Sequence, residues 1–402
     1  MTPFLQLIFA LMVIITAAKM GGWGAVRLGQ PAVLGELLIG VLLGPSLLDL
    51  LHWPLLSNSV DPHLLTEAVY ELAELGVICL MFLAGLEVDV REMRRTGRVA
   101  ALAGVFGVIV PLALGALMVL PFGYRGQAAL FVGMILTATS VSISAQTLLE
   151  LGMLRSREGI ALLGAAVVDD ILVILLLSVV VALASSGAGA AAIALVFVRM
   201  LLYLGLATVT AFVVLPRLAD WMDNQPISEG LTALVLVVTL AYAWLAEVGG
   251  GLAAITGAFI AGVGFGRSHL HATIARSMHT ITYAFLVPIF FVSIGLKTNV
   301  RLLVGPDLLL VFVLVIVAVA SKVLGSGICA RLGGFTSRES LRVGVGMISR
   351  GEVGLIVASV GVSAGLIKTE LFSIVTLIVL VTTLITPPLL RQAFTTKETS
   401  HA

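Results

Sequence analysis

Two adjacent acids, Asp169 and Asp170, interrupt an otherwise apolar run, GAAVVDDILVILLL (164–177). A carboxylate near the centre of a membrane-spanning helix costs roughly 2.5 to 3.5 kcal/mol on insertion scales, so two of them need a chemical reason. Adjacent helical residues point about 100° apart, which gives the two carboxylates different neighbours. A carboxylate that accepts either a proton or a hard monovalent cation, never both at once, is the minimum equipment for exchanging the two ions.

Lys322 lies at a matching depth in another apolar run. At about 1.5 Å per helical residue, Asp169 is roughly 18 Å beyond Arg157, and Lys322 is about 13 Å from Arg331. An ion pair between Lys322 and one of the two acids would lower the cost of burying the charges. The other acid would then be free to hold a cation or a proton. The alternative is a purely stabilising network, which leaves the second acid unexplained.

Two further polar stretches interrupt apolar runs. LTATSVSIS (136–144) is rich in hydroxyl groups, and MISRGEVG (347–354) places Gly351 between Arg350 and Glu352. Unwound backbone would expose carbonyl groups to a cation, and the opposed half-helix ends would require compensating charges such as Arg350 and Glu352. The alternative is that the hydroxyls bond to their own helix and that Gly351 permits close packing. The presence of both stretches in matching spans favours the break.

These residues must be positioned by helices that cross a membrane. Of the 402 residues, 59% are hydrophobic and 11% are charged, and the mean hydropathy is +1.15. Such a chain is too apolar for a soluble protein of this length. Its apolar segments are each long enough to cross about 30 Å of hydrocarbon. We predict an all-α integral membrane protein with about thirteen transmembrane helices, near residues 4–26, 32–50, 65–88, 98–121, 127–151, 156–185, 190–219, 229–248, 250–267, 277–298, 305–331, 338–363 and 369–391.

Two sequence matches indicate an internal repeat. Glycines recur with one spacing in GELLIGVLLG (35–44) and GAFIAGVGFG (257–266), and GLEVDVR (85–91) resembles GLKTNVR (295–301). Each match relates a span to the seventh span after it, and an odd shift gives the copies opposite orientations in the membrane. Inverted repeats are typical of secondary transporters, whose ion sites lie near the midplane at broken helices. The alternative is chance similarity between glycine-rich helices.

The repeat defines the expected organisation of a single membrane domain, residues 1–402. Repeat one covers about 4–185, a linker helix covers about 190–219, and repeat two covers about 229–391. Most Lys and Arg residues outside the spans fall in alternate loops and in the C-terminal tail. By the positive-inside rule, this distribution places the N-terminus outside and the C-terminus in the cytoplasm.

Composition says little about other partners. The formal net charge of +1 gives no indication of nucleic-acid binding. Cys79 and Cys329 both fall within predicted spans and form neither a disulfide framework nor a zinc pattern. We therefore expect no cofactor beyond the transported ions and no nucleic-acid partner.

Four segments resemble bacterial sodium/proton antiporters of the NapA type, within the monovalent cation:proton antiporter group that includes the Kef potassium systems. They are TATSVSIS (137–144), AAVVDD (165–170), SKVLGSGICARLGGF (321–335) and SRGEVGL (349–355), in the expected order. The likeness runs from about Leu5 to Arg391. It implies a NapA/NhaA-like fold with inverted-topology repeats and two crossed broken helices.

The resemblance also assigns residues to the site. It implies that Asp170 is the principal carboxylate that binds the monovalent cation, and that Asp169 is the partner of Lys322. The remaining site residues implied at the crossing of the broken helices are Thr139, Ser140, Arg350 and Glu352.

The resemblance further implies two subdomains and a homodimer in the inner cell membrane. A core (transport) subdomain would comprise about 65–185 and 277–391. A dimerisation or scaffold subdomain would comprise about 4–50 and 190–267.

The expected function is secondary antiport of protons against a monovalent cation, with Na+ or Li+ as the preferred candidates. A Kef-like K+/H+ antiporter is the alternative, although Kef systems usually carry an amide where this chain has Asp169. A cation channel is more remote, because an open pore needs neither an inverted repeat nor a buried lysine pair. An intramembrane aspartyl protease needs two carboxyl groups flanking one scissile bond, and adjacent helical positions diverge too far for that. We therefore expect a transporter and no enzyme.

Overall fold

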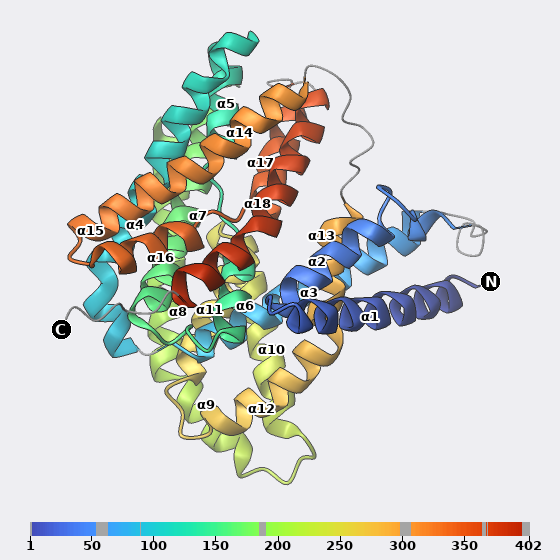
Figure 1. Ribbon diagram of the computed structural model, residues 1–402. Coiled ribbons are helices and arrows are strands. Elements are labelled where there is room, and N and C mark those ends of the chain that lie inside the picture. Colours follow the sequence, from blue (N-terminus) through green and yellow to red (C-terminus); the bar gives the residue numbers. More distant parts are fainter. Residues whose placement is uncertain are drawn as a thin grey trace, which may run out of the picture. The chain divides into compact units, whose positions relative to one another are not determined.

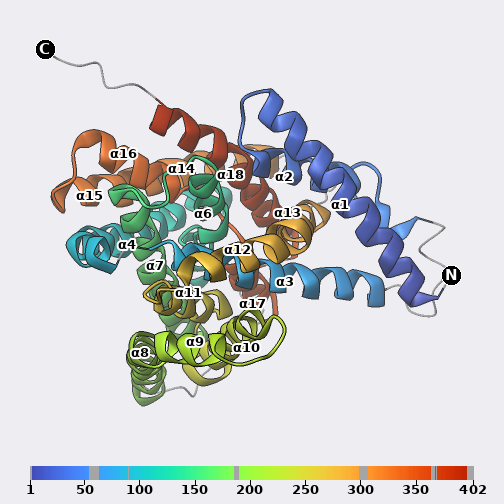
Figure 2. The same cartoon turned by 90° about the horizontal axis from the view of Figure 1, so that it is seen from below.

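The computed structural model describes residues 2–53, 63–88, 90–184, 190–297, 307–363, 367 and 369–395. Every regular element within these ranges is helical, as Figure 1 and Figure 2 show from two directions. The α-helices are α1 (Pro3–Arg27), α2 (Ala32–Leu43), α3 (His63–Leu86), α4 (Val90–Met118), α5 (Gln127–Ile135), α6 (Val141–Glu150), α7 (Arg157–Ala184), α8 (Ala190–Val213), α9 (Leu215–Asp223), α10 (Gly230–Trp244), α11 (Ala254–Phe265), α12 (His271–Ile281), α13 (Val287–Leu296), α14 (Asp307–Lys322), α15 (Ile328–Leu332), α16 (Ser337–Gly346), α17 (Glu352–Ser363) and α18 (Thr369–Thr395). Short 3-10 turns cover Leu50–His52 and Leu120–Phe122, and π-helical stretches cover Leu245–Gly250, Thr282–Leu286 and Val323–Gly327.

Helix length and composition fit a membrane protein. Within the described ranges, nine helices are long and apolar enough to cross a bilayer. The apolar helices α2 and α11 are shorter, while α5 with α6, and α16 with α17, are the halves of two interrupted spans. The predicted all-α membrane fold is therefore confirmed. The count of thirteen spans stays a prediction.

The chain forms two compact units, each containing helices from both sequence repeats. Unit 1 comprises Met1–Gly24, Gly35–Val90 and Ala190–Asn299, and unit 2 comprises Ala25–Leu34, Arg91–Gly189 and Val300–Ala402. Both interrupted spans belong to unit 2. The helices α3 and α13, which the resemblance places in the transport subdomain, pack within unit 1. These units are defined by packing, whereas the predicted subdomains are defined by which helices move during transport. The subdomain boundaries therefore stay a prediction.

In unit 1, glycines of the sequence repeat lie where helix backbones touch. A Cβ atom on Gly40 of α2 would lie 2.4 Å from the carbonyl oxygen of Val292 in α13. A Cβ atom on Gly262 of α11 would lie 2.1 Å from the carbonyl oxygen of Phe82 in α3. These distances are far shorter than van der Waals contact, so both positions require glycine.

These contacts are equivalent under the internal repeat. Because α2 matches α11 and α13 matches α3, each glycine-rich helix packs on a helix of the other half. The same pattern of contacts recurs about one turn later. A Cβ atom on Gly44 would lie 2.8 Å from the carbonyl oxygen of Gly295, and a Cβ atom on Gly266 would lie 2.8 Å from the carbonyl oxygen of Leu86. The glycine spacing in the sequence therefore has a packing cause.

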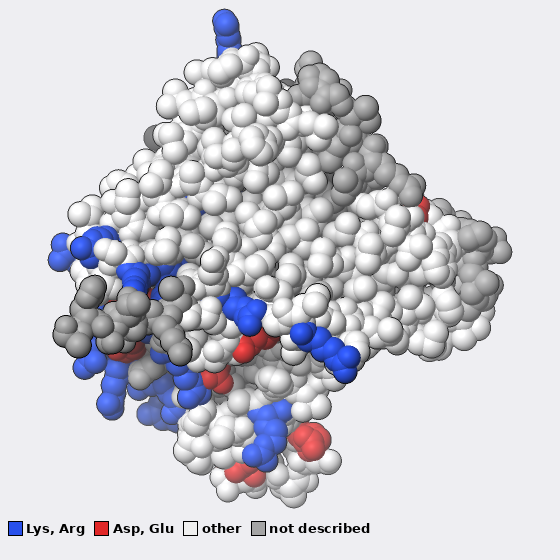
Figure 3. Space-filling view, viewed as in Figure 1, with Lys and Arg blue, Asp and Glu red and all other residues white. Residues whose placement is uncertain are grey.

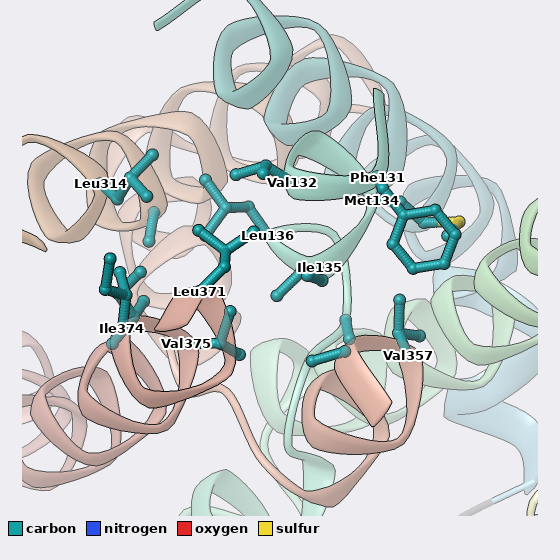
Figure 4. Packing of buried hydrophobic residues seen from close by; sticks show 14 of the residues in the cluster. Phe131, Val132, Met134, Ile135, Leu136, Leu314, Val357, Leu371, Ile374 and Val375 are labelled. Atoms are coloured by element: carbon teal, nitrogen blue, oxygen red, sulfur yellow. The ribbon is translucent and has the colours of Figure 1, made fainter. Parts of the chain in front are cut away.

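Unit 2 has a hydrophobic core around the halves α5 and α17, shown in Figure 4. Phe131 of α5, Leu314 of α14 and Leu371 of α18 are completely buried there. Helix α17 packs against both α5 and α18, and α14 packs against α18. In a bilayer the stabilisation comes from close packing, because lipid chains are as apolar as the core. This core holds one half of each interrupted span in place.

Arginine side chains concentrate at one end of unit 2. Figure 3 shows Lys and Arg gathered where Figure 1 places α4, α15 and α16. Arg157 Nη1 lies 3.4 Å from Glu339 Oε1, and Arg342 Nη1 lies 2.6 Å from Glu158 Oε1, which joins the starts of α7 and α16. Thr336 and Glu339 form a reciprocal capping box at the start of α16. A concentration of this kind is typical of a cytoplasmic surface.

Replacing Gly262 with alanine tests the close approach of α11 and α3. Alanine is favoured over glycine in a helix by about 1 kcal/mol, so any loss of stability must come from the added Cβ atom. We expect a lower melting temperature in detergent, with a net cost of about 1–3 kcal/mol typical of overpacking. Gly205→Ala in α8 is the control, because an added Cβ would meet nothing within 4 Å there. Equal melting temperatures for the two variants would contradict the assigned contact.

Candidate ion site at two crossing interrupted helices

Two buried carboxylates lie side by side in the chain within α7. Asp169 has no exposed surface, and Asp170 is 2% exposed. Their neighbours on the same helix include the small residues Ala165 and Ala166, which are also fully buried. Because successive helical side chains point about 100° apart, the two carboxylates face different parts of unit 2.

Lys322 is the direct partner of Asp169. The Lys322 Nζ atom lies 2.9 Å from Asp169 Oδ1, and both side chains are fully buried. Lys322 is the last residue of α14 and is followed at once by the π-helical stretch Val323–Gly327. Such stretches are frequent at functional sites. Separating one partner from this pair would leave an uncompensated charge in a medium where that is strongly destabilising.

The first interrupted span supplies hydroxyl groups beside this pair. Helix α5 ends at Ile135 and α6 begins at Val141, and the residues between them include Thr139 and Ser140, both buried. The side chain of Thr139 lies next to the Asp169 carboxylate. Ser140 has an extended backbone, with φ −91° and ψ 104°, so the chain is not helical at this point.

The second interrupted span crosses the first through its backbone. The Ser140 amide donates to the Ser349 carbonyl oxygen at 2.9 Å, and Ser349 Oγ donates to the Ser140 carbonyl oxygen at 2.8 Å. Ser144 Oγ donates to the Gly346 carbonyl oxygen at 2.5 Å. These bonds replace helical hydrogen bonds that the unwound residues lose, which is required for irregular backbone at this depth.

Gly351 is necessary at the crossing for steric reasons. A Cβ atom at this position would lie 2.6 Å from both Cβ and Oγ of Ser140. Any side chain larger than that of glycine would push the two unwound stretches apart. The structure therefore gives Gly351 a packing role that is specific to the contact between the two breaks.

Arg350 places a second positive charge in the site. It is almost completely buried, and its Nη1 atom donates to the carbonyl oxygens of Met347 at 3.2 Å and Ile348 at 3.1 Å. Its Nη2 atom donates to the carbonyl oxygen of Ala318 in α14 at 3.0 Å. The guanidinium thus lies at the C-terminal, negative end of the half-helix α16. Its charge also acts on Asp169.

Two threonines of α18 hold the backbone of Arg350 and were not identified from the sequence. The Arg350 amide donates to Thr382 Oγ1 at 3.3 Å, and Thr383 Oγ1 donates to the Arg350 carbonyl oxygen at 2.7 Å. Both threonines are fully buried. The adjacent hydroxyls in an apolar span were the only available signal.

The structure thus brings most of the expected site residues together. Lys322, Thr139 and Arg350 each act on the Asp169 carboxylate, Ser140 belongs to the crossing, and Asp170 follows Asp169 on α7. Glu352 is the first residue of α17, and its side chain lies outside the described part. Carboxylate, hydroxyl and backbone oxygens at a break in two helices are the groups with which transporters of this architecture hold a small cation or a proton.

Comparison with known proteins places these features in a family. Residues 11–394 match the family model described as sodium/hydrogen exchanger, transmembrane. The chain is 35% identical over 393 residues to the Na(+)/H(+)-K(+) antiporter GerN of Bacillus cereus, covering 98% of this chain and 97% of that protein. It is 34% identical over 394 residues to the Na(+)/H(+) antiporter of Enterococcus hirae, covering 98% and 99%.

A solved structure shares the fold. The sodium proton antiporter MjNhaP1 from Methanocaldococcus jannaschii superposes with a TM-score of 0.68 at 17% sequence identity, covering 98% of this chain and 99% of that chain. The family match spans almost the whole sequence, including both interrupted helices and the acids of α7. The chain therefore belongs to the transmembrane sodium/hydrogen exchanger family.

Proposed function

We propose that this protein is a secondary antiporter that exchanges protons for Na+ by alternating access. The observation that carries the proposal is the buried ion pair of Asp169 and Lys322, followed by a second buried carboxylate, Asp170, in the unit where two interrupted helices cross. A structural ion pair would need one acid, whereas exchange needs a further carboxylate that can change its occupant. The names of the two bacterial relatives support Na+ as the cation.

Asp170 is the proposed carrier of the exchanged ions. As a carboxylate it binds Na+, and as a carboxylic acid it carries a proton, so one occupant must leave before the other enters. The hydroxyl and backbone carbonyl oxygens of Thr139 and Ser140 are the proposed additional ligands, because unwound backbone offers such ligands in related architectures. Na+ and H+ are thus substrates, and no cofactor is part of the proposal.

Lys322 is the proposed counter-charge that alternates with the cation. While the site holds no Na+, its ammonium neutralises Asp169 at 2.9 Å. When Na+ arrives, Asp169 can turn to the cation, and Lys322 can give up a proton. Arg350 remains bound to three carbonyl oxygens throughout and compensates the end of α16.

K+ is the second candidate for the transported cation. The Bacillus cereus relative has potassium as well as sodium in its name, and two acids do not by themselves fix the size of the bound ion. We further propose a homodimer in the cell membrane, with the N-terminus outside and the arginine-rich end of unit 2 facing the cytoplasm. That orientation rests on the positive-inside rule.

Proteoliposomes that contain a pH dye test the function directly. Pulses of Na+, Li+ and K+ at equal ionic strength should each be compared for proton movement in the opposite direction. We expect a response to Na+ and Li+ and a smaller one to K+. A response to K+ alone would assign the second candidate, and ion flux at channel rates without proton movement would overturn antiport.

Asp170→Asn is expected to abolish exchange in the same vesicles. An amide cannot release a proton to make room for a cation, although it occupies nearly the same volume. Asp223→Asn on α9 changes an exposed acid in the same chemical way and should retain exchange. Near-normal exchange by Asp170→Asn would contradict the proposed mechanism.

Lys322→Gln is expected to lower thermal stability, since Asp169 would be left buried without its cation. Losses of about 3–5 kcal/mol are typical when one partner of a buried pair is removed. Adding Asp169→Asn to the same chain should recover part of the stability, although it need not restore exchange. A double-mutant cycle on the melting temperature at fixed ion concentration and pH measures the coupling. Strictly additive effects would remove Lys322 from its proposed role.

A further inference from the structure

Gly107, in the middle of α4, lies directly against the ion pair although no motif draws attention to it. A Cβ atom on Gly107 would lie 3.5 Å from Lys322 Nζ and 3.7 Å from Asp169 Oδ1. The backbone of α4 therefore covers the ion pair from a third helix, in addition to α7 and α14. A side chain of any kind at this position would touch both charged partners.

The same position also faces the π-helical stretch that follows Lys322. The added Cβ atom would lie 2.6 Å from Ser326 Oγ, which itself donates to the carbonyl oxygen of Ala103 in α4 at 3.0 Å. Ser326 is fully buried. One residue earlier, a Cβ atom on Gly325 would lie 2.6 Å from the carbonyl oxygen of Phe106. The segment that carries Lys322 is thus held against α4 at a distance that only glycine allows.

We propose that Gly107 is a positioning residue for ion exchange. Its missing side chain lets the segment from Lys322 to Ser326 close against α4, and this contact holds the Lys322 ammonium on Asp169. The inference rests on the proposed function, in which the ammonium and the transported cation are alternative counter-charges for the same carboxylates. A contact that favours the ammonium necessarily weakens the binding of the cation, because the two compete.

A methyl group at position 107 should therefore shift this competition. It cannot remain 2.6 Å from Ser326 Oγ, so the Ser326 hydroxyl must turn away and give up its hydrogen bond to the Ala103 carbonyl oxygen, which loosens the attachment of the Lys322 segment to α4. With a weaker ammonium contact, Asp169 becomes more available to Na+. We expect Gly107→Ala to lower the apparent KM for Na+ by about threefold or more, measured in proteoliposomes over a range of Na+ concentrations.

Two further variants separate positioning from simple loss of packing. Gly97→Ala changes another glycine of α4, where an added Cβ would meet nothing within 4 Å, and should leave the KM unchanged. Adding Ser326→Ala to Gly107→Ala removes the overlapping oxygen and should return the KM toward the wild-type value. An unchanged KM in Gly107→Ala, even with a lower melting temperature, would reduce Gly107 to a packing residue and overturn the proposal.

A thermal measurement keeps this inference distinct from the proposed function. The melting temperatures of Gly107→Ala, Lys322→Gln and the double variant form a cycle that needs no transport. If the wild-type protein exchanges no cation, the proposed function fails. The thermal cycle still tests whether Gly107 positions Lys322, because it needs no transport. A smaller effect of Gly107→Ala in the Lys322→Gln background supports positioning of the ammonium, and strict additivity overturns it.

Discussion

The cost of placing charge in a medium without water is the constraint on which the rest of this structure depends. Asp169, Asp170, Lys322 and Arg350 are all buried in unit 2, and when ionised their charges sum to zero. Isolated, each would be expensive. The ion pair at 2.9 Å and the three hydrogen bonds from Arg350 to carbonyl oxygens together lower the free-energy cost of burying these charges. In the proposed exchange, a cation that enters adds one positive charge to this neutral set, and release of a proton from Lys322 would restore neutrality.

The crossing of the interrupted spans is the second requirement, because hydrogen bonds between the two breaks replace part of the helical bonding that the unwound residues lose. Ser140 and Ser349 bond to each other through amide, carbonyl and hydroxyl groups, and Thr382 and Thr383 hold the backbone of Arg350 from α18. Gly351 allows the close approach. Each break is therefore held by specific hydrogen bonds and is not merely a local failure of helix formation.

Charge and depth made much of this site predictable from the sequence. Asp169 and Lys322 are rare residues in apolar spans, and a count of helical rise places them at one level. The recurring glycines predicted an internal repeat, and the structure places these glycines at contacts between helices. The sequence did not predict the roles of Thr382, Thr383 and Gly107. A threonine in a membrane helix usually bonds to the backbone of its own helix, and the sequence alone does not indicate which residue packs against a given glycine. The grouping of α3 and α13 in unit 1 depends on contacts between distant segments, which periodicity does not report.

The glycine contacts between helices of the two sequence halves in unit 1 have a consequence for biosynthesis. Gly40 packs on α13, and Phe82 of α3 receives α11, so part of the surface of α2 and α3 is covered only by helices that are translated later. During synthesis α2 and α3 enter the bilayer with narrow glycine faces that lipid chains must cover for the time it takes to translate the second half. Domains usually fold in order from the N-terminus. Here the faces of α2 and α3 that carry these contacts can reach their final packing only after α11 and α13 have been made.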